Sequence, residues 1–411
     1  AMRTRGLGGA VRPSLPLGRA CLFLRRGRRG GAIRGGKARP AHASHCDRRT
    51  LGLLTTLGGV AATCGNVNAE GIQSDTMPTV PQFQVRPDLS LSRIVKGCWQ
   101  LSGGHRGDRL SDRTSGKSAV EDFQAFVDAG ITTFDTADIY DPSEELIGRY
   151  VKSRGGAEGL QIFTKFCCFG RAMYTDATEG IVAKRIDASR SRLNVDKLDL
   201  VQLYWDDYRV KNYVQAALLL ASNPNVRHFG VTNFDAQTIE EMVAAGATPA
   251  INQVQYSLLD RRPENGTVAL CAKCGIKLMP YGVLAGGLLS DKYLGMPQSE
   301  VEVDTYSKSK YLSVIRQSGG WSWFQDLLRA AKEVADRHGA SISNVACRWV
   351  LDRPEVAGVL VGARNASHVR DHTKVFKLEL NPADLATIQA VLDSGTQAKG
   401  DCYAWERGGT F

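Results

Sequence analysis

Eight short runs of aliphatic and β-branched residues alternate with longer stretches in which apolar residues recur at helical spacing. This alternation constrains the fold most, because it specifies a parallel sheet with right-handed crossovers. A doubly wound sheet usually carries a glycine-rich phosphate loop after its first strand, and Gly103-Gly104 does not make that motif. Eight regular units predict a (β/α)₈ TIM barrel instead. The predicted strands are 92–97, 131–136, 161–165, 198–204, 226–231, 250–255, 276–281 and 357–361.

The segment after the seventh predicted strand, about 288–323, is rich in Gly, Ser and Tyr and is predicted to be a long loop. In a TIM barrel such a loop lies beside the C-terminal ends of the strands, where it can cover a ligand. The predicted helices are 121–129, 144–152, 178–193, 213–221, 236–245, 264–274 and 324–338.

The formal charge of +10 comes from the N-terminal region. Residues 1–69 hold thirteen basic side chains and one acidic side chain, whereas the rest of the chain is close to neutral. A near-neutral body implies no basic patch for DNA or RNA, so we expect no nucleic-acid partner. An arginine-rich leader without acids has the composition of an organellar transit peptide.

A second signal follows this leader. Arg48-Arg49 precede the apolar run 51–62, and the small-residue site Val67-Asn68-Ala69 comes after it. This order resembles a twin-arginine export signal, and two signals in tandem resemble the address of a chloroplast protein sent on to the thylakoid lumen. A single transit peptide with an incidental arginine pair is the alternative, and a mitochondrial leader is a further one. The run is too short to span a bilayer of about 30 Å, so we expect no stable membrane insertion.

These features divide the chain into three parts. We predict a targeting region over 1–69, a linker over 70–88 and a barrel domain over 89–411. The cysteines beyond residue 70 are odd in number and irregular in spacing, which argues against a disulfide framework. Cys271 and Cys274 form a lone CxxC with no second pair to complete a zinc site, so incidental thiols are favoured over a redox role and no metal is predicted.

Polar side chains follow three neighbouring predicted strands, at the end where barrel active sites lie. Asp135 ends the second strand and Tyr140 follows it, Lys165 ends the third strand, and Tyr204 ends the fourth. A lysine at the end of an apolar strand needs an acidic partner, and Asp135 is the candidate. A cation beside Tyr140 favours the phenolate and so suits the phenol for general acid catalysis. A structural Asp–Lys pair with a core tyrosine is the alternative.

These residues belong to a larger set of motifs, which occur in order along the chain. They are Phe134-Asp135-Thr136-Ala137-Asp138-Ile139-Tyr140, Thr164-Lys165, Gly230-Val231-Thr232-Asn233-Phe234, Asn252-Gln253-Val254-Gln255-Tyr256 and Gly362-Ala363-Arg364-Asn365. Together they resemble the signatures of the aldo-keto reductase family. The resemblance runs from about residue 92 to the C-terminal region, some three-quarters of the chain.

The resemblance implies an NADP(H)-dependent oxidoreductase that reduces a small-molecule carbonyl, an aldehyde or a ketone, to an alcohol. Tyr140 would be the proton donor, Lys165 its charged neighbour and Asp135 the partner of Lys165. The positions that match cofactor-binding residues of the family are Thr232, Asn233 and Gln253 for the nicotinamide carboxamide, Tyr281 for stacking on the nicotinamide ring, Gly362 and Arg364 at the 2′-phosphate, and His368 and Asp371 on the adenine side.

The chain departs from the family pattern at two positions. Tyr204 stands where the family usually has a histidine that orients the carbonyl and stabilises its oxyanion, and His372 stands where asparagine is common. A tyrosine hydroxyl can donate a hydrogen bond, but from a longer ring. Tyr204 therefore keeps a rival hypothesis open, a weakly catalytic or non-catalytic regulatory protein that binds NADP(H). Trp99, Trp205 and the segment 400–407 are candidate walls of the substrate pocket, with structural packing as the alternative.

We expect NADP(H) to bind more tightly than NAD(H), and Arg364→Ala to weaken NADPH binding by about tenfold while leaving NADH binding unchanged. The substitution removes a planar cation that can bind the extra phosphate bidentately. Titration of the full chain with both reduced cofactors at low salt gives the two dissociation constants. Equal constants in the parent, or an unchanged ratio in the variant, would contradict this expectation.

Overall fold

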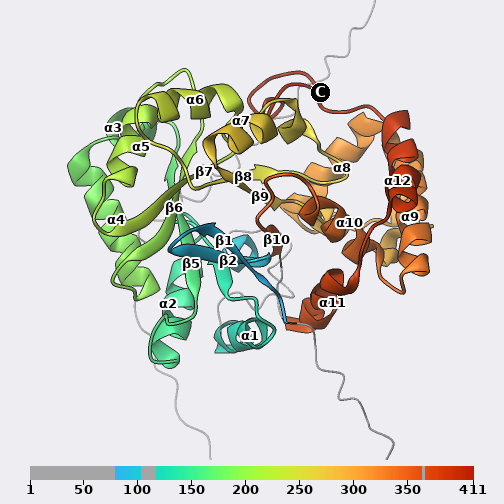
Figure 1. Cartoon of the computed structure of the whole chain (residues 1–411), viewed down its shortest axis with the longest axis horizontal. Helices are drawn as coiled ribbons and strands as arrows, with labels where there is room; N and C mark the ends of the chain where they lie inside the picture. Colours follow the sequence, from blue (N-terminus) through green and yellow to red (C-terminus); the bar gives the residue numbers. More distant parts are fainter. Residues whose placement is uncertain (1–78, 103–116, 363–365) are drawn as a thin grey trace, which may run out of the picture. The chain divides into compact units, whose positions relative to one another are not determined.

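Eight parallel strands form the barrel that the alternating pattern predicts (Figure 1). The computed structural model describes residues 79–102, 117–362 and 366–411, so the predicted targeting region over 1–69 lies outside the described residues. The strand order is β10-β3-β4-β5-β6-β7-β8-β9, and a parallel bridge between Leu278 and Val356 brings the two edge strands together. The predicted TIM barrel is therefore confirmed. The strands are β3 (Ile94–Gly97), β4 (Thr133–Asp135), β5 (Gln161–Cys168), β6 (Leu198–Trp205), β7 (Val226–Thr232), β8 (Ile251–Gln255), β9 (Lys277–Tyr281) and β10 (Val359–Gly362).

Helices return the chain between successive strands and cover the outside of the barrel (Figure 1). Every predicted helix is present, with ends within a few residues of those predicted. Local chemistry explains the boundaries: the Asp235 carboxylate accepts a hydrogen bond from the Thr238 backbone N–H at 2.9 Å at the start of α6, and Asn194 ends α4 with a φ of 56°. The helices are α1 (Lys117–Asp128), α2 (Ser143–Ser153), α3 (Ala172–Thr175), α4 (Glu179–Leu193), α5 (Tyr213–Ala221), α6 (Ala236–Ala244), α7 (Thr267–Cys274), α8 (Tyr306–Ser318), α9 (Gly320–Arg337), α10 (Ile342–Leu351), α11 (Val369–Thr373) and α12 (Pro382–Ser394).

A hairpin that the sequence analysis did not predict closes the N-terminal end of the barrel. Strand β1 (Gln82–Arg86) pairs antiparallel with β2 (Leu89–Ser92), so regular structure begins inside the segment predicted to be a linker over 70–88. Val85 and Leu91 are buried against the apolar floor of the barrel interior, which explains why so short a strand forms there. The barrel residues of that floor are Val95, Phe163, Leu200, Ile251, Met279 and Leu360.

The long connection after β9 is partly helical. Helix α8 starts where the Thr305 hydroxyl oxygen accepts a hydrogen bond from the Lys308 backbone N–H at 3.1 Å. Tyr311 on α8 is buried, and its hydroxyl occupies the space in which a Cβ on Gly282 would lie. The helix therefore packs closely on the end of β9, and the segment predicted as a loop places a helix beside the C-terminal ends of the strands.

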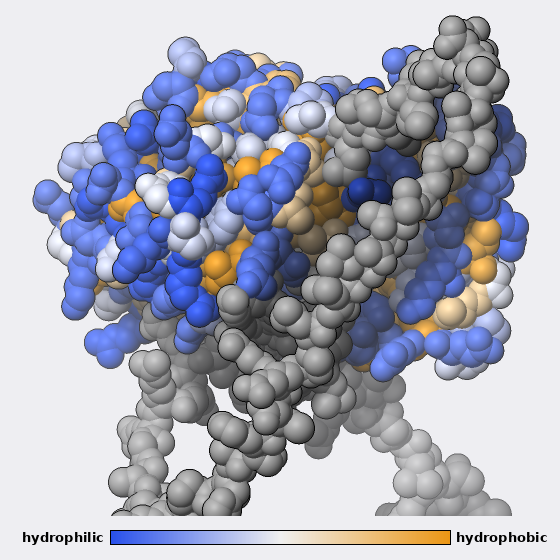
Figure 2. Space-filling model, turned by 90° about the horizontal axis from the view of Figure 1, so that it is seen from below, coloured by the Kyte–Doolittle hydropathy of each residue, from blue (hydrophilic) through white to orange (hydrophobic). Residues whose placement is uncertain are grey.

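Hydrophilic residues prevail on the face shown in Figure 2, with hydrophobic residues scattered among them. In the described part of the chain the exposed large hydrophobic side chains are Trp99, Tyr174 and Val303, and each lies on a connection that follows a barrel strand. Within the described ranges, no helix combines the length and the apolar composition that crossing a membrane requires.

Helix α2 packs on α4 through Gly148, where an added Cβ would lie 1.9 Å from the carbonyl oxygen of Arg192. We expect Gly148→Ala to lower the free energy of unfolding by about 2 kcal/mol, because the two backbones must separate. Gly180, exposed in the first turn of α4 with open space around it, offers a matched control. Gly180→Ala should raise the free energy of unfolding by at most about 1 kcal/mol, through helix propensity alone.

Urea unfolding of the full chain measures both substitutions. Equal effects of Gly148→Ala and Gly180→Ala would show that the close approach of α2 to α4 is not a constraint on stability.

Candidate active site

A buried ion pair joins the second and third strands of the barrel. Asp135 ends β4 and Lys165 lies in β5, and both side chains are less than 5% exposed. The ammonium of Lys165 donates to Asp135 Oδ1 at 2.5 Å and to the carbonyl oxygen of Thr136 at 2.8 Å. The structure thus brings together the lysine and the acid that the sequence analysis paired.

Two glutamine amides satisfy the other carboxylate oxygen. The Nε2 atoms of Gln202 on β6 and Gln253 on β8 donate to Asp135 Oδ2 at 2.7 and 2.8 Å, and Gln253 also donates to Gln202 Oε1 at 3.0 Å. A buried charge is tolerated when it is paired and hydrogen-bonded, and this network meets both conditions. Sequence reasoning missed Gln202, although a polar side chain between Val201 and Leu203 in the apolar part of β6 was a signal for it.

Tyr140 lies beside this ion pair, on the connection that follows β4. Its side chain is half-buried, and its ring centre is 5.3 Å from Lys165 Nζ. The backbone N–H of Tyr140 donates to the carbonyl oxygen of Ala137 at 3.0 Å, and that of Asp138 donates to the carbonyl oxygen of Lys165 at 3.3 Å. These bonds fold the connection back onto β5, so that a phenol, an ammonium and a carboxylate lie together at the C-terminal end of the barrel.

Tyr204 lies on the same side of β6 as Gln202, since alternate residues of a strand share a face. Its ring packs against that of Phe169, with 4.8 Å between the ring centres. Its hydroxyl donates to Asp206 Oδ1 at 3.4 Å; burial raises the pKa of Asp206, and the hydrogen bond from Tyr204 opposes that shift. The fourth strand therefore offers a hydroxyl donor, but one that already has an acceptor.

The two tryptophans predicted to line the pocket lie in different surroundings. Trp205 directly follows Tyr204, so only one of them can face the barrel interior. Trp205 is fully buried on the outer side, where its indole N–H donates to the carbonyl oxygen of Val210 at 2.9 Å and its ring packs on Tyr213. Trp99, in the single turn after β3 (Trp99–Leu101), is 36% exposed. Both tryptophans therefore lie at the C-terminal end of the barrel, but the Trp205 side chain packs on its outer side and only Trp99 is partly exposed there.

The ends of β7, β8 and β9 bring a second polar group next to the ion pair. The Thr232 hydroxyl and the Asn233 backbone N–H both donate to the carbonyl oxygen of Gln253, at 3.1 and 2.8 Å. The Tyr281 hydroxyl donates to Asn233 Oδ1 at 2.9 Å. Amides, a hydroxyl and a half-buried aromatic ring form a set that fits a flat ring bearing a carboxamide, because amides pair with such a group and the aromatic face stacks on the ring.

The residues predicted for the adenosine end of the cofactor follow β10. Gly362 ends that strand, and His368 and Asp371 lie in the short helical segment after it. His368 is exposed, and the Asp371 carboxylate accepts a hydrogen bond from the Ser341 hydroxyl at 3.3 Å. Arg364 lies outside the described residues.

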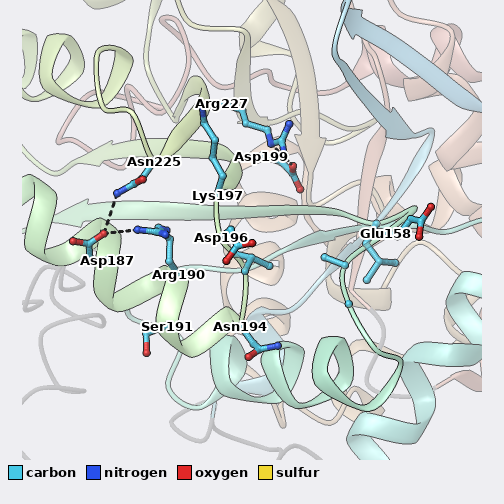
Figure 3. A pocket seen from close by; sticks show the side chains of 14 residues that line it. Glu158, Asp187, Arg190, Ser191, Asn194, Asp196, Lys197, Asp199, Asn225 and Arg227 are labelled. Carbon is cyan, nitrogen blue, oxygen red and sulfur yellow. Dashed lines mark hydrogen bonds and ion pairs between the residues drawn. The ribbon is translucent and has the colours of Figure 1, made fainter.

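A wide hollow of about 1060 Å³ lies at the opposite end of the barrel, around the first residues of β5, β6 and β7 (Figure 3). Several of its charged side chains have local partners: Asp187 accepts hydrogen bonds from Arg190 at 2.8 Å and Asn225 at 3.1 Å, and Arg227 lies 3.5 Å from Asp199. The hollow is a polar surface at the end of the barrel away from the Asp135–Lys165 pair, so the candidate site is the one at the C-terminal ends of the strands.

Neither metal nor thiol chemistry stands out in the part of the chain that the structure describes. No group of three or more His, Cys, Asp or Glu side chains there could hold a metal ion, and the cysteines there are free thiols. Burial raises the pKa of Cys271 to about 12, which makes the first cysteine of the CxxC motif a poor nucleophile.

The eight-stranded barrel, with an Asp–Lys pair beside a tyrosine at its strand ends, is the arrangement to compare with known proteins. The chain belongs to the Aldo/keto reductase family, whose model matches residues 93–393. Oxidoreductase chemistry at the strand ends, with a nicotinamide cofactor, is the activity that this family assignment supports.

Individual relatives agree with this assignment. The chain is 27% identical over 322 residues to the aldo-keto reductase YhdN of Bacillus subtilis (strain 168), covering 74% of this chain and 91% of that protein. It is 27% identical over 308 residues to the chloroplastic pyridoxal reductase of Arabidopsis thaliana, covering 69% and 78%. Its fold matches that of the glycerol dehydrogenase of Gluconobacter oxydans with a TM-score of 0.64 and 23% identity, over 78% of this chain and 97% of that one.

His372 on α11 is buried, and burial lowers its pKa to about 4, with Asp371 opposing the shift and His368 adding to it. A histidine in the unfolded chain has a pKa of about 6.5, so the unfolded state binds more protons between these two values. The contribution of buried, neutral His372 to the free energy of unfolding is therefore fully present above about pH 6.5. It is lost as the pH falls toward 4. We expect the parent to lose about 2 kcal/mol more stability than His372→Asn between pH 7.5 and pH 5.

Urea unfolding of the full chain at the two pH values measures this difference. His368→Asn, which changes an exposed histidine on the same segment, is the control and should keep most of the parent's pH dependence, because burial of His372 is the largest cause of the pKa shift and His368 only adds to it. The same pH dependence in His372→Asn and in the parent would assign the acid sensitivity to other groups.

Proposed function

We propose that this protein reduces an aldehyde or a ketone to an alcohol with NADPH as the hydride donor, and that Tyr140 donates the proton. The observation that carries the proposal is the position of Lys165, bound to Asp135 at 2.5 Å with its ammonium 5.3 Å from the Tyr140 ring centre. A positive charge fixed beside a phenol stabilises the negative charge that the phenol oxygen acquires as it gives up its proton.

Each of these side chains has a separate role in the proposed reaction. NADPH, when bound, supplies a hydride to the carbonyl carbon, and the proton of the Tyr140 hydroxyl goes to the carbonyl oxygen, so that C=O becomes CH–OH. Lys165 provides the charge that supports this transfer. Asp135 holds Lys165, and the amides of Gln202 and Gln253 hold Asp135, so the ammonium is already in place when the substrate arrives.

The same end of the barrel supplies the groups that would hold the cofactor. Thr232, Asn233 and Gln253 would bind the nicotinamide carboxamide, with Tyr281 stacked on the ring; their bonds to one another support this arrangement. The adenosine end would be bound after β10. The residues proposed there are Gly362, Arg364, His368 and Asp371, with Arg364 selecting NADP(H).

Because Tyr204 stands in the oxyanion position, we expect carbonyl reduction to be slow. In the oxyanion position its hydroxyl must leave Asp206 before it can donate to the substrate oxygen. A misplaced donor of this kind costs about 3 kcal/mol of transition-state stabilisation, which is about a hundredfold in rate. This feature also supports the second candidate, a regulatory protein that binds NADP(H) and catalyses weakly or not at all.

We further propose that residues 1–69 direct the protein to the chloroplast and onward to the thylakoid lumen. The order of the signals supports this, and so does a chloroplastic relative that is 27% identical. Sequencing the N-terminus of the protein from fractionated plastids tests the proposal. We expect a mature end near Glu70 in the lumen fraction, whereas an end near residue 46 in the stroma would contradict export.

Substitutions at the two tyrosines test the proposed reaction. Tyr204→His should raise kcat/KM on small aldehydes by at least about tenfold, because a histidine donor fits the oxyanion position. Tyr140→Phe keeps the ring but removes the proton, so turnover should fall by at least about a hundredfold while NADPH affinity stays within about twofold. Steady-state kinetics with a panel of aldehydes and fluorescence titration with NADPH give these values.

The outcomes separate the two candidate functions. Brisk aldehyde reduction by the parent with no gain in Tyr204→His would show that position 204 is not limiting. Tight NADPH binding without turnover in both the parent and Tyr204→His would favour the regulatory candidate.

A further inference from the structure

The C-terminal segment 400–407 is bound by the connections that follow β7 and β8, so it lies at the same end of the barrel as the candidate site. The Asp401 carboxylate accepts hydrogen bonds from the backbone N–H of Ala236 at 2.9 Å and from the Thr267 hydroxyl at 2.7 Å. The Glu406 carboxylate, only 1% exposed, pairs with Arg262 at 2.7 Å. These contacts anchor the segment at Asp401 and at Glu406, the residue directly before Arg407.

Asn233, which is part of the proposed nicotinamide site, has a φ of 65°, in the left-handed region. A non-glycine residue holds this conformation only where its surroundings over-determine it. Two donors converge on its carbonyl oxygen: the Tyr208 hydroxyl at 2.7 Å and Arg407 Nη1 at 3.0 Å. The tail therefore supplies one of the two side-chain hydrogen bonds that the Asn233 carbonyl oxygen accepts, while the Asn233 N–H donates to Gln253.

Arg407 is itself fixed by two further contacts. Its Nη2 donates to the carbonyl oxygen of Trp205 at 3.1 Å, and its guanidinium lies 3.8 Å from the centre of the Tyr208 ring. The guanidinium thus ties the end of β6 to the residue that follows β7. A planar group with several donors is suited to bridging two carbonyl oxygens, which a lysine ammonium does less well.

We propose that Arg407 is a positioning residue for the nicotinamide-binding group. It holds the Asn233 backbone, which sets the direction of the Asn233 side-chain amide. That amide accepts the hydrogen bond from the Tyr281 hydroxyl, so the orientation of the stacking ring depends on Arg407 as well. The inference rests on the proposed function, because it assigns these side chains to the nicotinamide.

Arg407 makes none of the hydrogen bonds that hold the Asp135–Lys165 pair. The loss of Arg407 should therefore weaken cofactor binding more than it weakens substrate binding. We expect Arg407→Ala to raise the dissociation constant of NADPH by about tenfold. The KM for an aldehyde, measured at saturating NADPH, should stay within about twofold. Arg407→Lys should fall between the parent and Arg407→Ala.

The experiment uses the full chain and a matched arginine. Arg93 donates to the backbone carbonyl oxygens of Leu351 at 2.8 Å and Val356 at 3.2 Å, at the opposite end of the barrel. Arg93→Ala removes a comparable structural bridge and should leave NADPH affinity as in the parent. Fluorescence titration with NADPH, together with urea unfolding, compares Arg407→Ala, Arg407→Lys and Arg93→Ala. Guanidinium at low millimolar concentration should recover part of the NADPH affinity of Arg407→Ala.

A second variant covers the case in which Arg407→Ala does not fold. Tyr208→Phe removes the other donor to the Asn233 carbonyl oxygen and should raise the dissociation constant of NADPH severalfold. Parent-like NADPH affinity in both Arg407→Ala and Tyr208→Phe, or equal weakening by Arg407→Ala and Arg93→Ala, would overturn the inference and leave the proposed function standing. No NADPH binding by the parent would overturn the proposed function and this inference with it.

Discussion

The Asp135 carboxylate is the point at which four strands of the barrel meet. Lys165 from β5, Gln202 from β6 and Gln253 from β8 all bond to an acid at the end of β4. A charge in a barrel interior is costly unless its partners are already in place. Hydrogen bonds to Asp135 therefore fix these strands relative to one another. The candidate site lies directly above this carboxylate, at the C-terminal ends of the strands.

The barrel interior changes from apolar to polar along its axis. The apolar residues that stabilise the barrel therefore lie at a different level from the residues of the candidate site. Its floor is apolar and is closed by the β1–β2 hairpin. Above the floor come the buried ion pair and its amides, and above these come the half-buried rings of Tyr140, Tyr204 and Tyr281. The ion pair lies below these rings and is less than 5% exposed, so its electrostatic interactions act in surroundings of lower polarity than water.

The sequence supported some parts of this description well. All eight barrel strands and the pairing of Asp135 with Lys165 followed from periodicity and from the rule that a buried lysine requires an acid. The β1–β2 hairpin was not predicted, although Gln82–Arg86 and Leu89–Ser92 both alternate polar and apolar residues, because most of that segment was assigned to a linker. Helix α8 lies in a segment predicted to be a loop, because the Gly and Ser residues around it obscure its apolar residues, and packing on the end of β9 defines its buried face.

The sequence by itself determined the order of strands and helices and the residue types at the strand ends, because both depend on neighbours a few positions apart. The tertiary structure alone decided which of the consecutive residues Tyr204 and Trp205 faces the interior, which amides complete the Asp135 site, and that Arg407 reaches Asn233. The last two contacts join residues far apart in the chain, by 67 positions between Gln202 and Asp135 and by 174 between Arg407 and Asn233, and only the closed barrel and the anchored tail bring them within hydrogen-bonding distance.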